Sequence, residues 1–306
     1  MTGPAQTSGD FTASFQIEGR PVRGRAVRMA GASIAPILAR HDYPPHLARI
    51  LGEAVTLAAL VGASLKFEGR ILVQAEGDGP VRLLVGEYST GGGVRGYARY
   101  DADAWANLDR LNKGRPPHMP QLFGPAGRLG LILIQDNPAL QPYQGIVPLS
   151  KATLSQCAED YYAMSEQVPS RIRLSVSQTE DGGWVAGGMM VQKIAGDAAR
   201  GDTTEAWHEA EALFGTLTET ELTDPDLPVA ELLFRLFHEQ GVRMEPGEAI
   251  SDHCTCNEDR LIATLRGMPD EALRELVEPD GTLSIDCQFC ARHYTIPITR
   301  VTSPAN

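Results

Sequence analysis

Cys254-Thr255-Cys256 and Cys287-Gln288-Phe289-Cys290 contain four of the five cysteines in the chain, and thirty residues separate the two pairs. Zinc binds four thiolates in a tetrahedron, and two closely spaced cysteine pairs on either side of a foldable segment can supply them from one chain. The pattern therefore predicts a structural zinc site. The second pair has the spacing of a zinc knuckle, whereas the first has a single intervening residue. This tighter spacing points to a second chemistry, because each pair is close enough to oxidise to an internal disulfide.

The composition is that of a globular protein with room for two domains. The chain has 306 residues, of which 42% are hydrophobic, enough to fill a core. Residues 1–10 have neither the basic start nor the apolar run of a secretory signal. The most apolar run, residues 54–65, is shorter than the roughly 18 residues that a membrane span needs. We therefore expect a cytoplasmic location without membrane association, where clustered cysteines serve as metal ligands or redox sensors.

The charge of the chain is unevenly distributed. Residues 1–150 carry 15 Lys and Arg against 12 Asp and Glu, a net charge of +3, and residues 151–306 carry 12 against 27, a net charge of −15. Residues 197–231 contain ten acidic side chains and only Arg200 to offset them. Such a segment repels phosphate backbones, so we do not expect nucleic acid as a partner. The simplest interpretation of the charge alone is a solvated helical face.

The first two thirds of the chain predict antiparallel strands around one central helix. Pro44-Pro45 begins this helix, and apolar residues recur at helical spacing from Leu47 to Leu65. The glycine-rich turns between the later strands are not followed by helices, so a phosphate-binding loop is not expected there. The expected strands are a hairpin within 11–29, three runs at 69–76, 81–88 and 94–100, two at 130–135 and 143–147, and a hairpin of 171–178 and 184–193.

The fifth cysteine, Cys157, lies on a helix that Ser150 or Thr153 caps and that runs to Gln167. It shares an apolar face with Leu154, so we expect it to pack in the core as a small hydrophobic residue. A catalytic nucleophile is the alternative. No histidine is near in sequence and no nucleophile motif surrounds Cys157, so we assign no catalytic residue.

The segment after Ile194 predicts short helices that need a partner surface. Gly196–Gly201 marks the boundary, and helices are expected at 202–215 and 229–240. Helices of this length are marginal alone, so they should fold only while docked. The second helix carries four apolar residues on one face, which are Leu232, Leu233, Leu236 and Phe237.

The last segment predicts a small domain that depends on its metal. We expect helices at 258–267 and 270–277, a strand at 282–286 and a returning strand at 293–298. About fifty residues with few large apolar side chains cannot form a sufficient core. Structural zinc contributes on the order of 10–16 kcal/mol to the folding of small domains near neutral pH.

These elements together predict the α+β fold class. We expect an N-terminal domain of antiparallel strands packed around a central helix (residues 1–196), an acidic helical linker (197–245) and a small C-terminal zinc-binding domain (246–306).

The spacing of the four cysteines, Cys-x-Cys followed after thirty residues by Cys-x-x-Cys, is the most specific motif in the chain. With it, the chain resembles the 33-kDa chaperonin family of redox-regulated heat-shock holdases, from about Arg23 to Tyr294. Other stretches that agree are Ala63-Ser64-Leu65-Lys66-Phe67, Gly77-Asp78-Gly79-Pro80, Val94-Arg95-Gly96-Tyr97-Ala98, Tyr143-Gln144-Gly145-Ile146-Val147 and Ser165-Glu166-Gln167. His253 departs from the apolar or aromatic residue expected before the first cysteine, which leaves it open as an alternative ligand or as a base that tunes the thiols.

The resemblance implies an ATP-independent chaperone rather than an enzyme. Its reduced form would hold one Zn²⁺ per chain on Cys254, Cys256, Cys287 and Cys290 and would be inactive. Its oxidised, zinc-free form would bind unfolding client proteins and form a homodimer. If oxidation joins the cysteines within each pair, the C-terminal domain would unfold and uncover apolar faces for clients, with Leu232, Leu233, Leu236 and Phe237 as candidates.

Three other interpretations stay open on the residues alone. A zinc ribbon without redox function could bind nucleic acid or a protein, although the acidic half of the chain counts against nucleic acid. A thiol oxidoreductase could use Cys287 and Cys290, but such an enzyme needs a helix N-terminus under its first cysteine, and strands are expected on both sides here. The zinc could also be purely structural, which is common for sites of four cysteines.

Overall fold

The computed structural model describes residues 9–64, 66, 68–137, 139–194 and 203–302. By its internal contacts the chain divides into two compact units, Met1–Asp252 and His253–Asn306. None of the helices within the described residues is long and apolar enough to cross a membrane.

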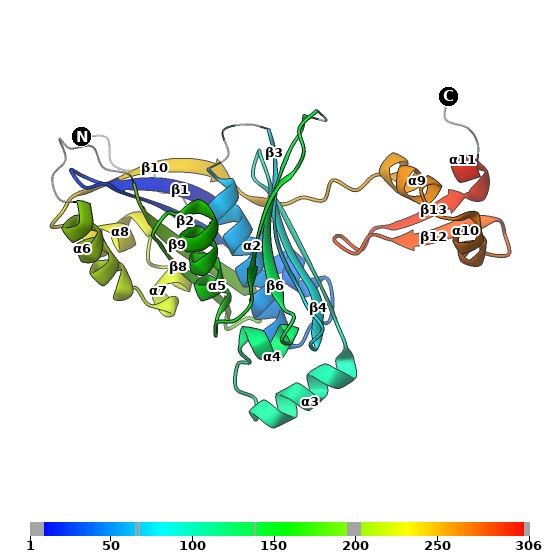
Figure 1. Ribbon diagram of the computed structural model, residues 1–306, viewed down its shortest axis with the longest axis horizontal. Helices are drawn as coiled ribbons and strands as arrows, with labels where there is room; N and C mark the ends of the chain where they lie inside the picture. Colours follow the sequence, from blue (N-terminus) through cyan, green and yellow to red (C-terminus); the bar gives the residue numbers. More distant parts are fainter. Residues whose placement is uncertain (1–8, 65, 67, 138, 195–202, 303–306) are drawn as a thin grey trace. The chain divides into compact units, whose positions relative to one another are not determined.

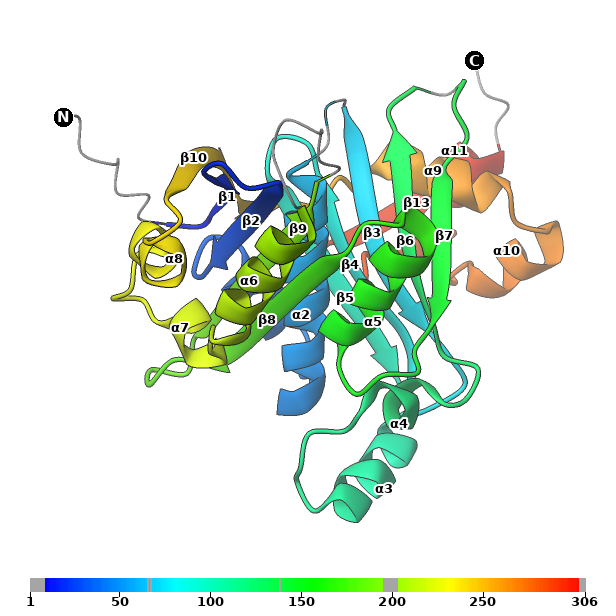
Figure 2. The same cartoon turned by 60° about the vertical axis from the view of Figure 1, so that its left-hand side comes forward.

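The first unit is built from two sheets with helix α2 (Pro45–Gly62) between them (Figures 1 and 2). The first sheet has the order β10 (Val242–Ala249), β1 (Phe11–Ile17), β2 (Val22–Met29), β9 (Trp184–Lys193), β8 (Ser170–Gln178). The second has the order β11 (Ser251–Asp252), β5 (Gly93–Tyr100), β4 (Val81–Ser89), β3 (Gly69–Glu76), β6 (Arg128–Gln135), β7 (Tyr143–Pro148). All pairings are antiparallel except that of β11 with β5. The predicted α+β fold class and its antiparallel strands are confirmed.

Helix α2 is buried on nearly every side. Pro45 is its first residue, where a missing N–H costs nothing, and 14 of its 18 residues are buried. The sheets approach it so closely that glycine is required: a Cβ on Gly86 of β4 would lie 2.4 Å from the carbonyl of Ala54. The predicted central helix is confirmed as far as Gly62, whereas Leu65 and Phe67 lie outside the described residues.

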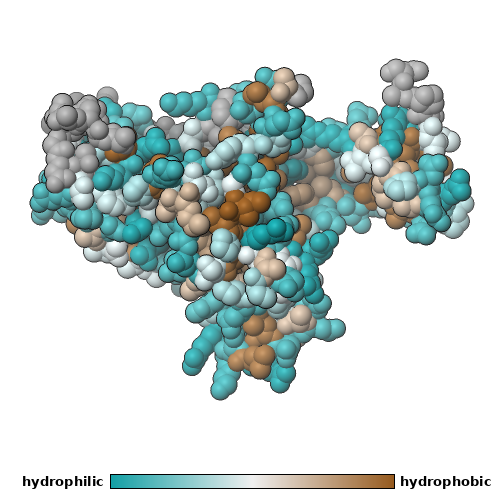
Figure 3. Space-filling model, viewed as in Figure 1, coloured by the Kyte–Doolittle hydropathy of each residue, from teal (hydrophilic) through white to brown (hydrophobic). Residues whose placement is uncertain are grey.

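Three helices cover the other face of the first sheet, which are α6 (Thr203–Gly215), α7 (Glu219–Thr223) and α8 (Val229–Phe237). Leu232, Leu233 and Phe237 of α8 pack with Phe15 of β1 in a second apolar core. In the view of Figure 3, the outward side of these helices is mostly hydrophilic. The acidic segment therefore folds as expected, docked on a sheet through its apolar side.

The linker helices are also held by an arginine beneath them. Arg28 of β2 donates hydrogen bonds to the backbone carbonyls of Asp224 and Leu227, in the loop between α7 and α8. This loop is thereby fixed to the sheet at a point where its own carbonyl groups have no helical partners.

Five further helical segments lie within the described residues of the first unit, and one predicted helix accounts for two of them. Thr153 caps α5 (Leu154–Tyr161), as expected, and the predicted helix continues as a π-helical turn, η1 (Tyr162–Glu166). The others are α1 (Ile34–Ala39), α3 (Ala102–Asn112) and α4 (Met119–Phe123). Helix α3 escaped prediction because Trp105 is its only buried residue, although Asp101 caps its N-terminus.

Strands β10 and β11 were not predicted, and they bear on the domain boundaries. The expected start of the zinc-binding domain at residue 246 falls inside β10, which pairs with β1, and the compact units separate only after Asp252. The expected boundary at Gly196–Gly201 lies outside the described residues. The three-part division of the chain stays a prediction.

The second unit is a hairpin with three short helices. Strands β12 (Thr282–Asp286) and β13 (His293–Pro297) pair antiparallel, and the helices are α9 (Glu258–Arg266), α10 (Asp270–Leu276) and α11 (Ile298–Thr302). Its core has six buried apolar residues, which are Ile262, Leu265, Leu273, Leu283, Ile296 and Val301. The expected elements are present, and the core is as small as expected.

The close approach of β4 to α2 gives a first prediction. We expect Gly86→Ala to lower the free energy of unfolding of the first unit by about 1–3 kcal/mol, because the new methyl group would overlap the backbone of Ala54. Urea denaturation followed by tryptophan fluorescence measures this change. Gly31→Ala is the matched control, since a Cβ there meets no atom within 4 Å and should leave stability unchanged. Equal stabilities of the two variants would contradict the prediction.

Candidate metal centre

Two chain segments bring the four cysteines together, and the first lies just before α9. Cys254 and Cys256 precede Asn257, whose side chain accepts a hydrogen bond of 2.8 Å from the backbone N–H of Arg260 and so caps the helix. The Arg260 guanidinium donates to the carbonyl oxygen of Thr255 at 3.1 Å. The residue between the two cysteines is thus fixed to the first turn of the helix.

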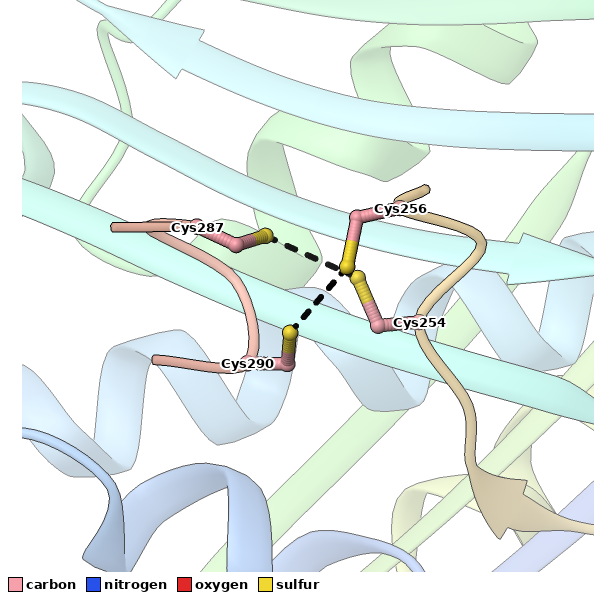
Figure 4. A group of neighbouring side chains, drawn as sticks. All are labelled: Cys254, Cys256, Cys287 and Cys290. Atoms are coloured by element: carbon pink, nitrogen blue, oxygen red, sulfur yellow. Dashed lines mark hydrogen bonds between the residues drawn. The ribbon is translucent and has the colours of Figure 1, made fainter. Parts of the chain in front are cut away.

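The second segment is the turn that joins β12 to β13. The backbone N–H of Cys287 donates to the carbonyl of Arg292 at 2.9 Å, and the N–H of Ala291 donates to the carbonyl of Cys287 at 2.7 Å. Ala291 adopts a left-handed conformation with φ of 55°. This tight turn places Cys287 and Cys290 on the same side, facing the first pair (Figure 4).

The four sulfurs form a compact group. All four Sγ atoms lie within 4.8 Å of one another, and no disulfide joins them. The Cys254 and Cys287 sulfurs are 3.8 Å apart, and those of Cys256 and Cys290 are 3.3 Å apart. Sulfurs bound to one tetrahedral zinc at about 2.3 Å would be separated by roughly 3.8 Å. Four cysteines in this arrangement could hold a metal ion, as the sequence predicts.

The thiols influence one another and a neighbouring tyrosine. Burial disfavours ionisation of Cys256, but the hydroxyl of Tyr294, which donates to its sulfur at 3.1 Å, and the other three thiols outweigh burial and lower its pKa to about 7. Burial and hydrogen bonding to the other cysteines raise the pKa of Cys290 to about 12. The cluster therefore favours a thiolate on Cys256 first, and a cation at its centre would favour ionisation of all four.

The other candidate residues lie elsewhere. His253 is exposed, and it does not belong to the group of ligand atoms within 4.8 Å, which within the described ranges consists of the four cysteines. Cys157 is fully buried on α5 in the other unit, and burial raises its pKa, which confirms its expected place in the core. The candidate client-binding residues Leu232, Leu233, Leu236 and Phe237 are all buried, on the side of α8 that faces the sheet.

Comparison with known proteins decides the family of the chain. The family model described as Hsp33 protein matches residues 10–297. A protein of Caulobacter vibrioides named 33 kDa chaperonin is 46% identical over 303 residues, which cover 97% of this chain and 98% of that protein. The chain belongs to the Hsp33 family. Its general role is therefore that of an Hsp33 chaperone with a cluster of four cysteines that could bind metal.

Other relatives extend the comparison. A 33 kDa chaperonin of Hahella chejuensis is 34% identical and covers 95% of both chains. The crystal structure of the Hsp33 homologue from Thermotoga maritima matches this fold with a TM-score of 0.75, at 23% identity and with coverage of 95% of this chain and 96% of that one. The sequence resemblance to the 33-kDa chaperonin family is thus confirmed.

Sequence reasoning missed Tyr294 as a part of the Hsp33 cysteine cluster. Its hydroxyl reaches Cys256 across 38 positions in sequence, through the pairing of β12 with β13, and no local pattern signals such a contact. The capping role of Asn257 had a local signal, because Asn directly before a helical segment is a preferred N-cap.

The geometry predicts that each cysteine of the cluster is needed for metal binding. We expect Cys256→Ser to reduce the zinc content of the purified protein severalfold and to speed hydrogen exchange in residues 258–302, because the small core loses its metal. Mass spectrometry under native conditions and hydrogen exchange measure both effects. Cys157→Ala, which removes the cysteine outside the cluster, should keep the full zinc content. Unchanged exchange in the second unit of Cys256→Ser would refute this prediction.

Proposed function

We propose that this chain is a redox-regulated, ATP-independent holdase whose reduced form holds one Zn²⁺ on Cys254, Cys256, Cys287 and Cys290 and is inactive. The observation that carries the proposal is the gathering of four free thiols from two distant segments within 4.8 Å. Four thiolates in a tetrahedral arrangement favour zinc over magnesium or calcium, which prefer oxygen ligands. Zinc bound there would supply a cross-link between the two segments.

Oxidation would remove this cross-link without replacing it. In each pair, two thiolates would give up two electrons and form one disulfide, and one peroxide molecule would be reduced to two hydroxide ions, so two peroxides release one Zn²⁺. In the thiol form two sulfur contacts join the pairs, 254 with 287 at 3.8 Å and 256 with 290 at 3.3 Å, so the two segments lie in contact before oxidation. A loop closed within one pair is too short to restrict the unfolded chain appreciably, whereas zinc closes a loop of more than thirty residues.

The second unit would depend on the zinc cross-link because its apolar core is small. Six buried apolar residues are too few to offset the conformational entropy of about fifty ordered residues, so the unit should unfold when zinc leaves. Unfolding of the second unit would act on the segment that directly precedes it, which is β10 followed by β11. This strap is attached by the pairing of β10 with β1, by the ion pair of Arg40 with Asp252, and by the hydrogen bond from Tyr88 to Glu248 at 2.8 Å.

Release of the strap and of the helices before it would uncover apolar surface for clients. The buried side of α8 and the face of the first sheet beneath it form one continuous core, with Phe15 and Phe237 rings 6.1 Å apart. Exposed patches of this kind bind unfolding chains, and the ten acidic residues of 197–231 would keep the open form soluble. We propose that activation also permits a homodimer, because two open copies can cover each other's apolar faces.

The rival functions have less support. Cys287 follows a strand and not a helix N-terminus, so the thiol activation that an oxidoreductase requires is missing at this position. The acidic linker argues against a nucleic-acid partner. The relatives are named as chaperonins and not as enzymes, which supports a non-catalytic role, and we propose the cytoplasm as the location, where the thiols stay reduced.

Oxidative activation gives a direct prediction. Peroxide with mild heat should release about one zinc per chain, as the proposed site requires, and switch on suppression of the aggregation of a heat-denatured client without ATP. A chromogenic zinc chelator and light scattering, read on the same sample, measure the two effects. Zinc release without any gain in suppression would refute the switch and leave the metal site intact.

The buried side of α8 gives a second prediction. Leu233 is 1% exposed and its neighbour Phe234 is 61% exposed. We expect Leu233→Asp to detach α8, because it buries an unpaired carboxylate, and to give the reduced protein aggregation suppression with its zinc still bound. Phe234→Asp, on the solvent side of the same helix, should stay inactive until oxidised. If hydrogen exchange shows α8 detached in Leu233→Asp while the reduced protein stays inactive, α8 does not cover the client surface.

A further inference from the structure

A groove of about 140 Å³ lies on the first sheet, on the opposite face from α6–α8. It crosses β10, β1 and β2, which lie side by side in Figure 2. Helix α2 packs against the same face farther along the sheet, over β2, β9 and β8. Most residues that line the groove are polar, namely Ser14, Gln16, Arg23, Arg25, Arg243 and Glu245, and Phe15 and Gly24 complete the lining.

The strand register sets these side chains in two rows. Paired residues on neighbouring strands point to the same face of a sheet, and residues two apart on one strand do so as well. The rows are Arg243–Gln16–Arg23 and Glu245–Ser14–Arg25. The alternate residue Phe15 points to the other face, into the core under α8. Three arginines, one glutamate and two neutral hydrogen-bonding side chains therefore share one side of the sheet, within three consecutive positions of each strand.

Among the residues that the structure describes, two of the three arginines have no counter-ion. Within the described part of the chain, no carboxylate lies within ion-pair distance of Arg23 or Arg25, whereas Arg243 lies 3.6 Å from Glu245. Arg25 is half-buried, and burial lowers its pKa to about 10, with Tyr162 raising it and Arg23 lowering it further. Arg23 and Arg25 are two positive charges about 7 Å apart along one strand, and Arg25 is partly removed from water. The two charges repel each other, and a bound anion would relieve this repulsion.

Tyr162 adds a donor beside the same arginines. It begins the π-helical turn η1, it is 8% exposed, and its hydroxyl has no hydrogen-bond partner among the residues described. Burial raises its pKa to about 12, while the charges of Arg25 and Arg23 act in the opposite direction. At neutral pH the hydroxyl is therefore protonated and free to donate. Single π-helical turns of this kind occur frequently at functional sites.

We propose that Arg23 and Arg25, with Ser14 and Gln16, form a binding site for a phosphate group. The planar guanidinium offers paired N–H donors that match phosphate oxygens, and the hydroxyl and amide can satisfy the remaining oxygens. The groove has room for one such group. Arg243 from β10 reaches the same groove, so a bound phosphate ties this edge strand to β1 and β2.

The source of the phosphate group can be a free ion or a short phosphate chain. A second cavity of about 400 Å³ adjoins the groove and shares Gln16 and Arg243 with it. This second cavity also contains Glu18, and its Arg20 forms an ion pair with Glu209 at 3.0 Å. It therefore attracts a negatively charged phosphate chain less strongly than the first groove does. The free ion is therefore the expected ligand, and tripolyphosphate tests the other source.

The test uses the reduced, zinc-loaded full chain with potassium phosphate, against potassium chloride at matched ionic strength. We expect saturable binding in calorimetry and a rise of about 2–4 °C in the Tm of the first unit at saturation. Arg25→Met and Arg23→Met should each weaken phosphate binding by about tenfold or more, since each removes a charged donor. Neither variant is expected to lose stability without phosphate, because each also removes a like-charge neighbour. Arg99→Met, an exposed arginine of β5 on the other sheet, is the control and should bind as the unchanged chain does.

Binding and stability are read without oxidation, so the outcome does not depend on the proposed chaperone switch. A rise in Tm that chloride reproduces, or affinities of Arg25→Met and Arg23→Met equal to that of the control, would overturn the site. If tripolyphosphate binds more tightly than phosphate and through the same arginines, the site takes a phosphate chain. Equal or weaker binding of tripolyphosphate supports the free ion.

Discussion

The crowding of four sulfurs within 4.8 Å is the constraint on which the second unit depends. Neutral thiols form only weak hydrogen bonds. Hydrogen bonds from Tyr294 and the other thiols lower the pKa of Cys256 against the effect of burial, whereas burial and the other thiols raise the pKa of Cys290. A metal ion bound there would be the principal source of stability for a domain with six buried apolar residues. The same sulfurs are then the most readily oxidised groups of the domain, because thiolates react and thiols do not. Stability and sensitivity to oxidants thus come from one set of atoms.

The first unit is built around a large apolar core and not around a cluster of cysteines. Its α2 is enclosed by two sheets, and close packing at Gly86 leaves no room for a methyl group, so this core needs no metal. On the proposed function, the second unit would unfold while the first persists, because its apolar core is much smaller. The segment from α8 to β11 belongs to the first unit and directly precedes the second, so on the proposed function it would be the part that responds.

Much of this arrangement could be predicted from sequence, and the failures have physical causes. Short-range cysteine spacing predicted the cluster, because the pairs need only one tight turn each. Apolar periodicity predicted α2 and the hairpins of the first sheet. Strand β10 could not be found in this way, since its sequence, VRMEPGEA, is mostly polar and contains proline and glycine; it exists because β1 offers an unpaired edge. Tyr294 was missed for a similar reason, because its bond to Cys256 depends on the pairing of β12 with β13.

The two sides of α8 explain how such a segment can be both a cover and a solubilising tail. Its buried side packs on the sheet, its solvent side carries Glu231, Phe234 and Arg235, and the other acidic residues of 197–231 precede it. Detachment would therefore expose apolar side chains from the helix and the sheet together, while the acidic residues stay in water in both states. This cover is held by the hydrogen bonds of Arg28, by an edge strand and by a modest apolar face, and on the proposed function it would be lost when the second unit unfolds.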